Sequence, residues 1–299
     1  MDKDDTSRKL DALLDILGDF LSDTIVKPNW ATKTAFRWKK RFGIRGHFQA
    51  LNRVDQVVLQ DLQGIEKQKK IIRENTQILV NGFVANNILL TGARGTGKSS
   101  VVKAIFNKFA NRSLRLIEVS KEDLVDIPDM VEALHDDKYK FIIFCDDLSF
   151  EANDPGYKAL KAVLDGSIVS LPSNVVIYAT SNRRHLMPDY FADNASNKHK
   201  GDEIHPAESI EESVSLSERF GLWVSFYPFD QTQYLSIVKY WVNKIGGVDS
   251  NQNLLEKEAL QWAIKRGSRS GRIARQFAIN WVGRDRNLKS SDGTREKNR

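Results

Sequence analysis

The chain has little of several features that define other classes of protein. It has one cysteine, Cys145, among 299 residues, so an internal disulfide is excluded and a reducing cytoplasm is the expected compartment. No apolar run approaches the roughly 20 residues that a transmembrane helix requires, and no basic stretch leads into an apolar run as in a signal peptide. The 41% of hydrophobic residues suffices for a large core in one or two domains.

One stretch near the N-terminus has no acidic residue at all, between Thr24 and Val54. Basic and aromatic residues alternate there: Lys27, Trp30, Lys33, Phe36, Arg37, Trp38, Lys39, Lys40, Arg41, Phe42, Arg45 and Phe48. Phosphate contacts with base stacking would use this composition, so residues 27–48 are a candidate nucleic-acid site. The alternative is that the rings pack on the core while the charges stay in solvent, and the net charge of +6 is compatible with both.

Periodicity divides the chain into four regions. Residues 1–58 combine a predicted helix, with apolar residues at helical spacing between residues 10 and 21, and the basic, aromatic stretch. Residues 59–228 alternate helices with short apolar runs, which predicts a parallel sheet covered on both faces. The predicted strands are Asn87–Leu90, Leu114–Val119, Phe141–Cys145, Val175–Thr180 and Leu222–Phe226.

The third region, residues 229–284, is predicted to be a small all-helical domain. Asp230 can cap its first helix, which Gly246 and Gly247 end. A second helix ends at Gly267, and a third begins near Ser270. Residues 285–299 contain almost nothing apolar and are expected to form a disordered tail.

A phosphate-binding loop is the strongest motif. Gly92, Ala93, Arg94, Gly95, Thr96, Gly97, Lys98 and Ser99 match G-x-x-x-x-G-K-[ST], with a predicted strand before them and a helix from Ser100 after them. The glycines let backbone N–H groups turn toward phosphates, and the helix N-terminus adds partial positive charge. Lys98 is expected to reach the β- and γ-phosphates of ATP and Ser99 to bind Mg²⁺.

Two carboxylates, Asp146 and Asp147, follow the apolar strand Phe141–Cys145. At this place Asp146 is the candidate Mg²⁺ ligand, and Asp147 the candidate base that orients or deprotonates the attacking water. Glu151 is a second candidate for the base. The alternative is that both aspartates only cap the next loop.

These motifs and two further runs give the chain a resemblance to AAA+ ATPases. The runs are Ala179-Thr180-Ser181-Asn182-Arg183-Arg184-His185-Leu186 and Ser217-Glu218-Arg219-Phe220-Gly221-Leu222. From about Asn29 to Gly283 the chain is similar to a bacterial AAA+ family catalogued as a domain of unknown function. The resemblance implies an α/β nucleotide-binding core with a five-stranded parallel sheet, a helical lid domain and an ATPase site.

The resemblance also implies roles for single residues. Asn182 would be sensor 1, which positions the lytic water, and Ile65 would pack on adenine. Arg219 would be an arginine finger that reaches the γ-phosphate of a neighbouring subunit. Arg272, with Arg275 as the alternative, would be sensor 2 and couple the nucleotide state to the lid.

A finger of this type implies self-association in a ring or stacked homo-oligomer, with six subunits as the expected number. ATP would then drive the remodelling or loading of a macromolecular partner, either an unidentified protein substrate or adaptor or a nucleic acid. The alternatives are a nucleotide-gated assembly switch or DNA-associated loader with slow hydrolysis, and a metabolite kinase. A kinase leaves the finger, both sensors and the lid unexplained. The aspartate at 147, where AAA+ proteins more often have glutamate, is shorter by one methylene and puts the hydrolysis rate in question.

Overall fold

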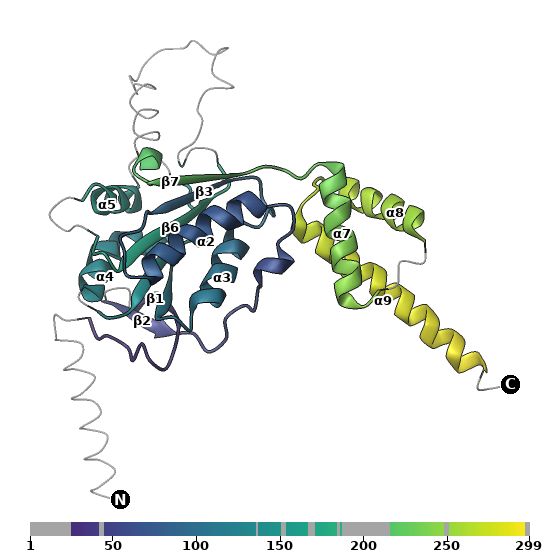
Figure 1. Ribbon diagram of the computed structural model, residues 1–299, viewed down its shortest axis with the longest axis horizontal. Coiled ribbons are helices and arrows are strands. Elements are labelled where there is room, and N and C mark those ends of the chain that lie inside the picture. The colour runs from purple at the N-terminus through teal and green to yellow at the C-terminus, as the bar shows by residue number, and fades with distance from the viewer. Residues whose placement is uncertain are drawn as a thin grey trace, which may run out of the picture.

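A seven-stranded sheet forms the centre of the protein (Figure 1). The computed structural model describes residues 25–41, 45–135, 137–150, 154–166, 171–183, 186, 216–247 and 251–296. The strands are β1 (Ala35–Arg41), β2 (Arg45–Ala50), β3 (Ile88–Gly92), β4 (Leu114–Val119), β5 (Lys140–Cys145), β6 (Val175–Ser181) and β7 (Leu222–Phe226). Their order across the sheet is β2-β1-β4-β5-β6-β3-β7.

The five predicted strands are confirmed as β3 to β7, with ends that shift by at most two residues. Each pairs with its neighbour in parallel. The side chains of β3, β5 and β6 are buried on both faces, which explains why these strands appear in the sequence as largely apolar runs, whereas β7 has exposed side chains at the sheet edge. The carboxyl ends of all five strands therefore meet at one edge of the sheet.

The sheet has two strands more than predicted, and both come from the basic, aromatic stretch. β1 pairs with β4 in parallel, and β2 pairs with β1 in antiparallel fashion at the sheet edge. Successive side chains of a strand face opposite ways, so Phe36 and Trp38 point into the core while Arg37 stays exposed. Trp30 and Phe48 are buried beside them, at 5% and 6% exposure.

The expectation that these rings stack on nucleic-acid bases is therefore wrong for Trp30, Phe36, Trp38 and Phe48, because they pack on one another and on Phe141 of the core. Two of the basic residues between these rings form salt bridges within the protein. Arg37 pairs with Glu118 at 2.6 Å and Lys40 with Asp126 at 3.0 Å. Phe42 and the predicted helix over residues 10–21 lie outside the described residues.

Helices cover the sheet on both faces. They are α2 (Glu66–Val80), α3 (Lys98–Phe109), α4 (Ile127–Leu134) and α5 (Pro155–Leu164), with short 3₁₀ turns η1 (Leu59–Asp61) and η2 (Lys121–Asp126). The chain moves one way along the sheet from β3 to β4 and the other way from β4 to β6, so right-handed crossovers place α3 opposite α4 and α5. Ile142 and Phe144 pack with α2 and α3, whereas Phe141 and Ile143 pack with α4 and α5.

Three helices follow the sheet: α7 (Gln231–Ile245), α8 (Gln252–Lys265) and α9 (Gly271–Glu296). Asp230 and Gln233 form a capping box at the start of α7, and Gly246 ends it with a φ of 82°. These helices lie at the end of the sheet where β7 has its carboxyl end (Figure 1). α9 continues to Glu296, whereas a disordered tail was expected from residue 285.

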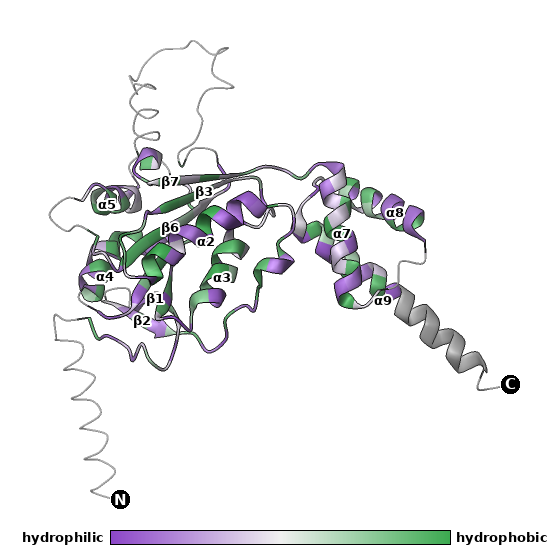
Figure 2. Ribbon diagram, viewed as in Figure 1, coloured by the Kyte–Doolittle hydropathy of each residue, from purple (hydrophilic) through white to green (hydrophobic). Residues whose placement is uncertain are grey.

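Hydropathy agrees with this layering. Figure 2 shows β3 and β6 as largely hydrophobic and β2, at the sheet edge, as hydrophilic. Within the described ranges, no helix is both long and apolar enough to cross a membrane.

Candidate functional site

The loop Gly92–Ser99 joins the carboxyl end of β3 to the first turn of α3. Gly92, Gly95 and Gly97 have φ angles of 129°, 76° and 103°, which L-residues with a side chain rarely adopt. A Cβ atom on Gly92 would lie 1.9 Å from the carbonyl oxygen of Phe226 on β7. Glycine at this position is therefore required both by backbone conformation and by the closeness of the adjacent strand.

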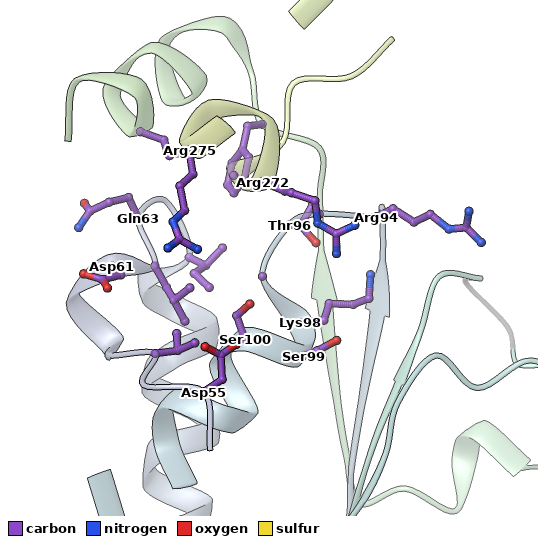
Figure 3. Close-up of a pocket in the computed structure, with 18 of the residues that line it drawn as sticks. Asp55, Asp61, Gln63, Arg94, Thr96, Lys98, Ser99, Ser100, Arg272 and Arg275 are labelled. Atoms are coloured by element: carbon purple, nitrogen blue, oxygen red, sulfur yellow. The ribbon is translucent and has the colours of Figure 1, made fainter. Parts of the chain in front are cut away.

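A pocket of about 720 Å³ lies between this loop, the segment before α2, and helices α7 and α9 (Figure 3). One end is polar and charged, with Lys98, Ser99, Asp146 and Asp147. The other end combines apolar and polar side chains, and its apolar residues are Val57, Leu62, Ile65, Phe229, Ile237, Trp241 and Ile279. Such a division fits a ligand with an anionic end and a flat, apolar end.

Lys98 occupies the centre of the polar end and is buried. Its ammonium group donates hydrogen bonds to the carbonyl oxygens of Gly92 and Ala93, at 2.7 and 2.8 Å, and to Oδ1 of Asn182, at 2.9 Å. Burial lowers the pKa of Lys98, and the negative charges of Asp147 and Asp146 partly offset that effect. The lysine is therefore held in place by oxygen atoms at the mouth of the loop.

Asp146 lies directly against Ser99. The Ser99 hydroxyl donates to Oδ1 of Asp146 at 2.5 Å, and the Thr180 hydroxyl donates to the same oxygen at 2.6 Å. Hydroxyl and carboxylate oxygens side by side are a donor set that suits Mg²⁺. The two residues that the sequence nominated as metal ligands thus meet in the structure, although they are 47 positions apart.

Asp147 is held by two residues at the end of β6, Thr180 and Asn182. Its peptide N–H donates to the Thr180 hydroxyl at 2.9 Å, and the Asn182 amide donates to its carboxylate. Its φ of 56° is left-handed, a conformation in which aspartate and asparagine are enriched. Asn182 consequently bridges Lys98 and Asp147, which places three of the nominated residues in one chain of hydrogen bonds.

Thr180 was missed as a site residue by the sequence reasoning. It contacts Asp146 through its hydroxyl and the peptide of Asp147 as an acceptor. The signal was present, because Thr180 and Asn182 are two positions apart at the end of β6 and so face the same way.

The start of α9 closes the pocket from the other side. The peptide N–H of Gly271 donates to the carbonyl oxygen of Gly95 at 3.0 Å, so the helix contacts the loop directly. Arg272 and Arg275 both line the pocket. In Figure 3 Arg272 lies beside Thr96 at the polar end of the pocket, whereas Arg275 points toward the segment that carries Gln63. The geometry therefore favours Arg272 as the residue near phosphates.

The remaining nominated residues are distributed as follows. Ile65 is buried at 4% exposure, and a Cβ on Gly97 would lie 3.4 Å from its Cδ1 atom. Ser100 lines the pocket, while the side chain of Arg94 is exposed and points away from it in Figure 3. Glu151 lies outside the described residues.

Arg219 does not line the pocket. It precedes β7, which runs parallel to β3, and so it lies at the opposite end of the sheet from the phosphate loop. The five residues of β7 alone span about 17 Å. Its Nε atom donates to Asp165, the residue that ends α5. Arg219 is thus fixed on the face that carries α5, far from the pocket of its own chain.

The residues of the pocket suit ATP with Mg²⁺. The loop provides a cradle that side chains at Gly92, Gly95 and Gly97 would disturb, and the first turn of α3 presents its N-terminal dipole to it. Lys98 supplies a cation, and the apolar end has room for a base. The Ser99–Asp146 pair supplies oxygen donors for the metal ion.

The comparisons with known proteins agree with this geometry. Residues 31–285 match the family described as "Protein of unknown function (DUF815)". The chain belongs to this family. No curated protein sequence is detectably similar to it.

Solved structures show the fold class. The ORC1 protein of Aeropyrum pernix, solved in complex with DNA, is 14% identical, with a TM-score of 0.50 and coverage of 73% of this chain and 59% of that one. The RuvB Holliday junction branch migration motor of Thermotoga maritima is 16% identical, with a TM-score of 0.46 and coverage of 74% and 63%. Trip13, in an Escherichia coli MS115-1 HORMA:CdnC:Trip13 complex, gives 13% identity, a TM-score of 0.49 and coverage of 74% and 90%.

This chain spans 63% of that RuvB structure, so only the shared fold is compared. The protein has the fold of AAA+ P-loop ATPases.

Proposed function

We propose that the protein is an AAA+ ATP hydrolase that binds ATP with Mg²⁺ in the pocket and works as a homo-oligomer. The observation that carries this proposal is the hydrogen-bonded chain Lys98–Asn182–Asp147 at the mouth of the phosphate loop. The three side chains come from α3, the end of β6 and the end of β5. A structural ion pair would need only two of them, whereas a hydrolytic site needs a cation for the phosphate, a base and a residue that orients water.

In this proposal the polar end of the pocket binds the triphosphate. Lys98 exchanges its carbonyl partners for phosphate oxygens, and the N–H groups of the loop surround the same oxygens. Ser99 and Asp146 hold the metal ion, with Thr180 fixing the carboxylate. When bound, Mg²⁺ supplies positive charge that offsets the charge on the phosphates. Arg272 adds a second cation from α9 and so links phosphate binding to the position of the three-helix unit α7–α9.

Asp147 accepts a proton from the attacking water while Asn182 orients both groups. The proton moves to a carboxylate oxygen as the oxygen of water bonds to the γ-phosphorus and the bond to ADP breaks. Since the Asn182 amide already engages Asp147, one oxygen of the carboxylate is committed and the other serves as the acceptor. This restricted base and its short side chain favour slow turnover, which supports a nucleotide-gated switch or loader as the second candidate function.

Arg219 is the reason for proposing an oligomer. It lies at the wrong end of β7 to reach its own phosphate loop, so a role in hydrolysis requires the pocket of a second subunit. A planar guanidinium there would offset charge that develops in the transition state. We expect a ring or stack, with six subunits as the working number, and we propose that assembly couples ATP to the remodelling or loading of a macromolecular partner.

Two classes of partner remain candidates, a protein and a nucleic acid. Because Trp30, Phe36, Trp38 and Phe48 are buried, the support for nucleic-acid binding by residues 27–48 comes from their positive charge. A protein substrate or adaptor is therefore the leading expectation. A pull-down with the Asp147→Asn variant in ATP, with bound protein and nucleic acid both identified, distinguishes the two.

The proposed function is tested by Lys98→Ala, with Lys108→Ala as a control that removes an exposed lysine from the last turn of the same helix. We expect ATP binding measured by calorimetry to weaken at least tenfold and phosphate release to vanish, because a charge-assisted contact with phosphate is lost. The control should retain both. Wild-type binding and turnover in Lys98→Ala would refute the assignment of this pocket.

A further inference from the structure

Asn107 lies on α3, nine residues after Lys98, and does not line the pocket. Its amide nitrogen Nδ2 donates two hydrogen bonds to backbone carbonyl oxygens, to Asp55 at 2.8 Å and to Val57 at 2.9 Å. Asp55, Gln56 and Val57 do line the pocket, next to its apolar end. One side chain outside the pocket therefore clamps a segment of its wall.

The clamped segment is flanked by Val54 and Leu59, which both pack against the core. It lies between β2 and η1 and belongs to no helix or strand. In the part of the chain that the structure describes, the carbonyl groups of Asp55 and Val57 have no other hydrogen-bond donor. Asn107 therefore supplies the hydrogen bonds that these two carbonyl groups receive within the described residues.

The same helix forms both ends of the pocket. Its first turn carries Lys98 and Ser99, which line the polar end. Asn107 is about 13 Å further along the helix axis, at 1.5 Å per residue, and contacts the wall near the apolar end. Because a helix is stiff, α3 sets the spacing between the phosphate-binding loop and this wall.

We propose that Asn107 is a positioning residue that holds Asp55–Val57 as a preformed wall for the nucleobase, so that selectivity for a nucleoside triphosphate over a bare triphosphate depends on it. The inference rests on the proposed ATP site. A wall that is already ordered adds affinity, since the ligand does not have to order it on binding. Phosphate binding, which uses the other end of α3, does not depend on the clamp.

The test replaces Asn107 by aspartate, which keeps the shape but replaces both donated hydrogen bonds by a carboxylate facing two carbonyl oxygens. Calorimetry measures the Kd for ATP and for inorganic tripolyphosphate, each with Mg²⁺, with Lys108→Ala as the control. We expect ATP to bind about tenfold more weakly, which corresponds to 1.4 kcal/mol, and tripolyphosphate to bind within about twofold of the wild type. The affinity for ATP divided by the affinity for tripolyphosphate should therefore fall about tenfold in Asn107→Asp.

Two results overturn the inference. An unchanged Kd for ATP shows that the clamp has no role in binding, and an equal loss for ATP and tripolyphosphate shows that Asn107 only supports the fold. If Asn107→Asp unfolds, as thermal melting would reveal, Asn107→Ser is the second variant, and the same ratio is measured. Failure of the proposed function looks different, because the wild-type protein itself would then bind neither ligand.

Discussion

Replacing Asp147 by asparagine separates catalysis from binding more cleanly than any other change in the pocket. Asp147 has a φ of 56°, which asparagine tolerates about as well as aspartate. Its peptide N–H keeps the bond to the Thr180 hydroxyl, since that bond does not involve the side chain. Alanine at the same position would add a backbone cost of about 1–2 kcal/mol and confuse the result.

The expected loss follows from the role of the carboxylate. A positioned general base contributes about 10²–10⁴-fold, so kcat for phosphate release should fall at least 100-fold. The Kd for ATP should stay within about threefold, because Lys98 and the loop bind the phosphates. Asp129→Asn is the control, since it makes the same chemical change on an exposed carboxylate of α4.

Steady-state phosphate release and calorimetric binding decide between two outcomes. Unchanged turnover in Asp147→Asn would refute the reasoning and transfer the role of the base elsewhere, with Glu151 as the next candidate. A large loss of ATP affinity would show instead that the carboxylate helps to hold Lys98, whose pKa it raises against the effect of burial.

Two further predictions concern the subunit contact and the loop. Arg219→Ala should lose turnover while binding ATP normally, and mixing it with Asp147→Asn should restore part of the activity, because intact pockets then meet intact fingers; no rescue in a mixture that assembles would exclude action in trans. Gly92→Ala should lower the free energy of unfolding by about 3 kcal/mol or more, since its Cβ would meet the carbonyl of Phe226 at 1.9 Å. Gly82→Ala, with a φ of 90° and nothing within 4 Å, measures the conformational part alone in urea unfolding.

Short sequence patterns predicted those features that depend on neighbouring residues in the chain. The phosphate loop needs glycines, a lysine and a serine at fixed spacing, so eight consecutive residues identified it. The strands β3, β5 and β6 were evident because strands buried on both faces consist largely of apolar residues, whereas β4 and β7 were recognised as short apolar runs that include Arg115, Glu118 and Ser225. Capping residues such as Asp230 marked the helix start for the same reason, since a cap acts on its own first turn.

Strands near the edge of the sheet were harder to predict. The sequence left two interpretations of the basic, aromatic stretch open, a nucleic-acid site and rings packed on the core with the charges in solvent. The structure shows the packed arrangement for Trp30, Phe36, Trp38 and Phe48, which composition could not decide because it does not tell which side of a strand faces the core. The tertiary pairing of β1 with β4 decided it.

The sequence by itself determined that this protein has a parallel α/β core with a phosphate loop, an acidic pair after a buried strand and helices after the last strand. Only the tertiary structure decided which side chains meet. Lys98 and Asn182 are 84 residues apart and touch because parallel strands bring their carboxyl ends to one edge. The tertiary structure also placed Arg219 at the far end of β7 and Asn107 behind the pocket wall. Contacts of this range depend on strand order and crossover direction, which no short stretch of sequence contains.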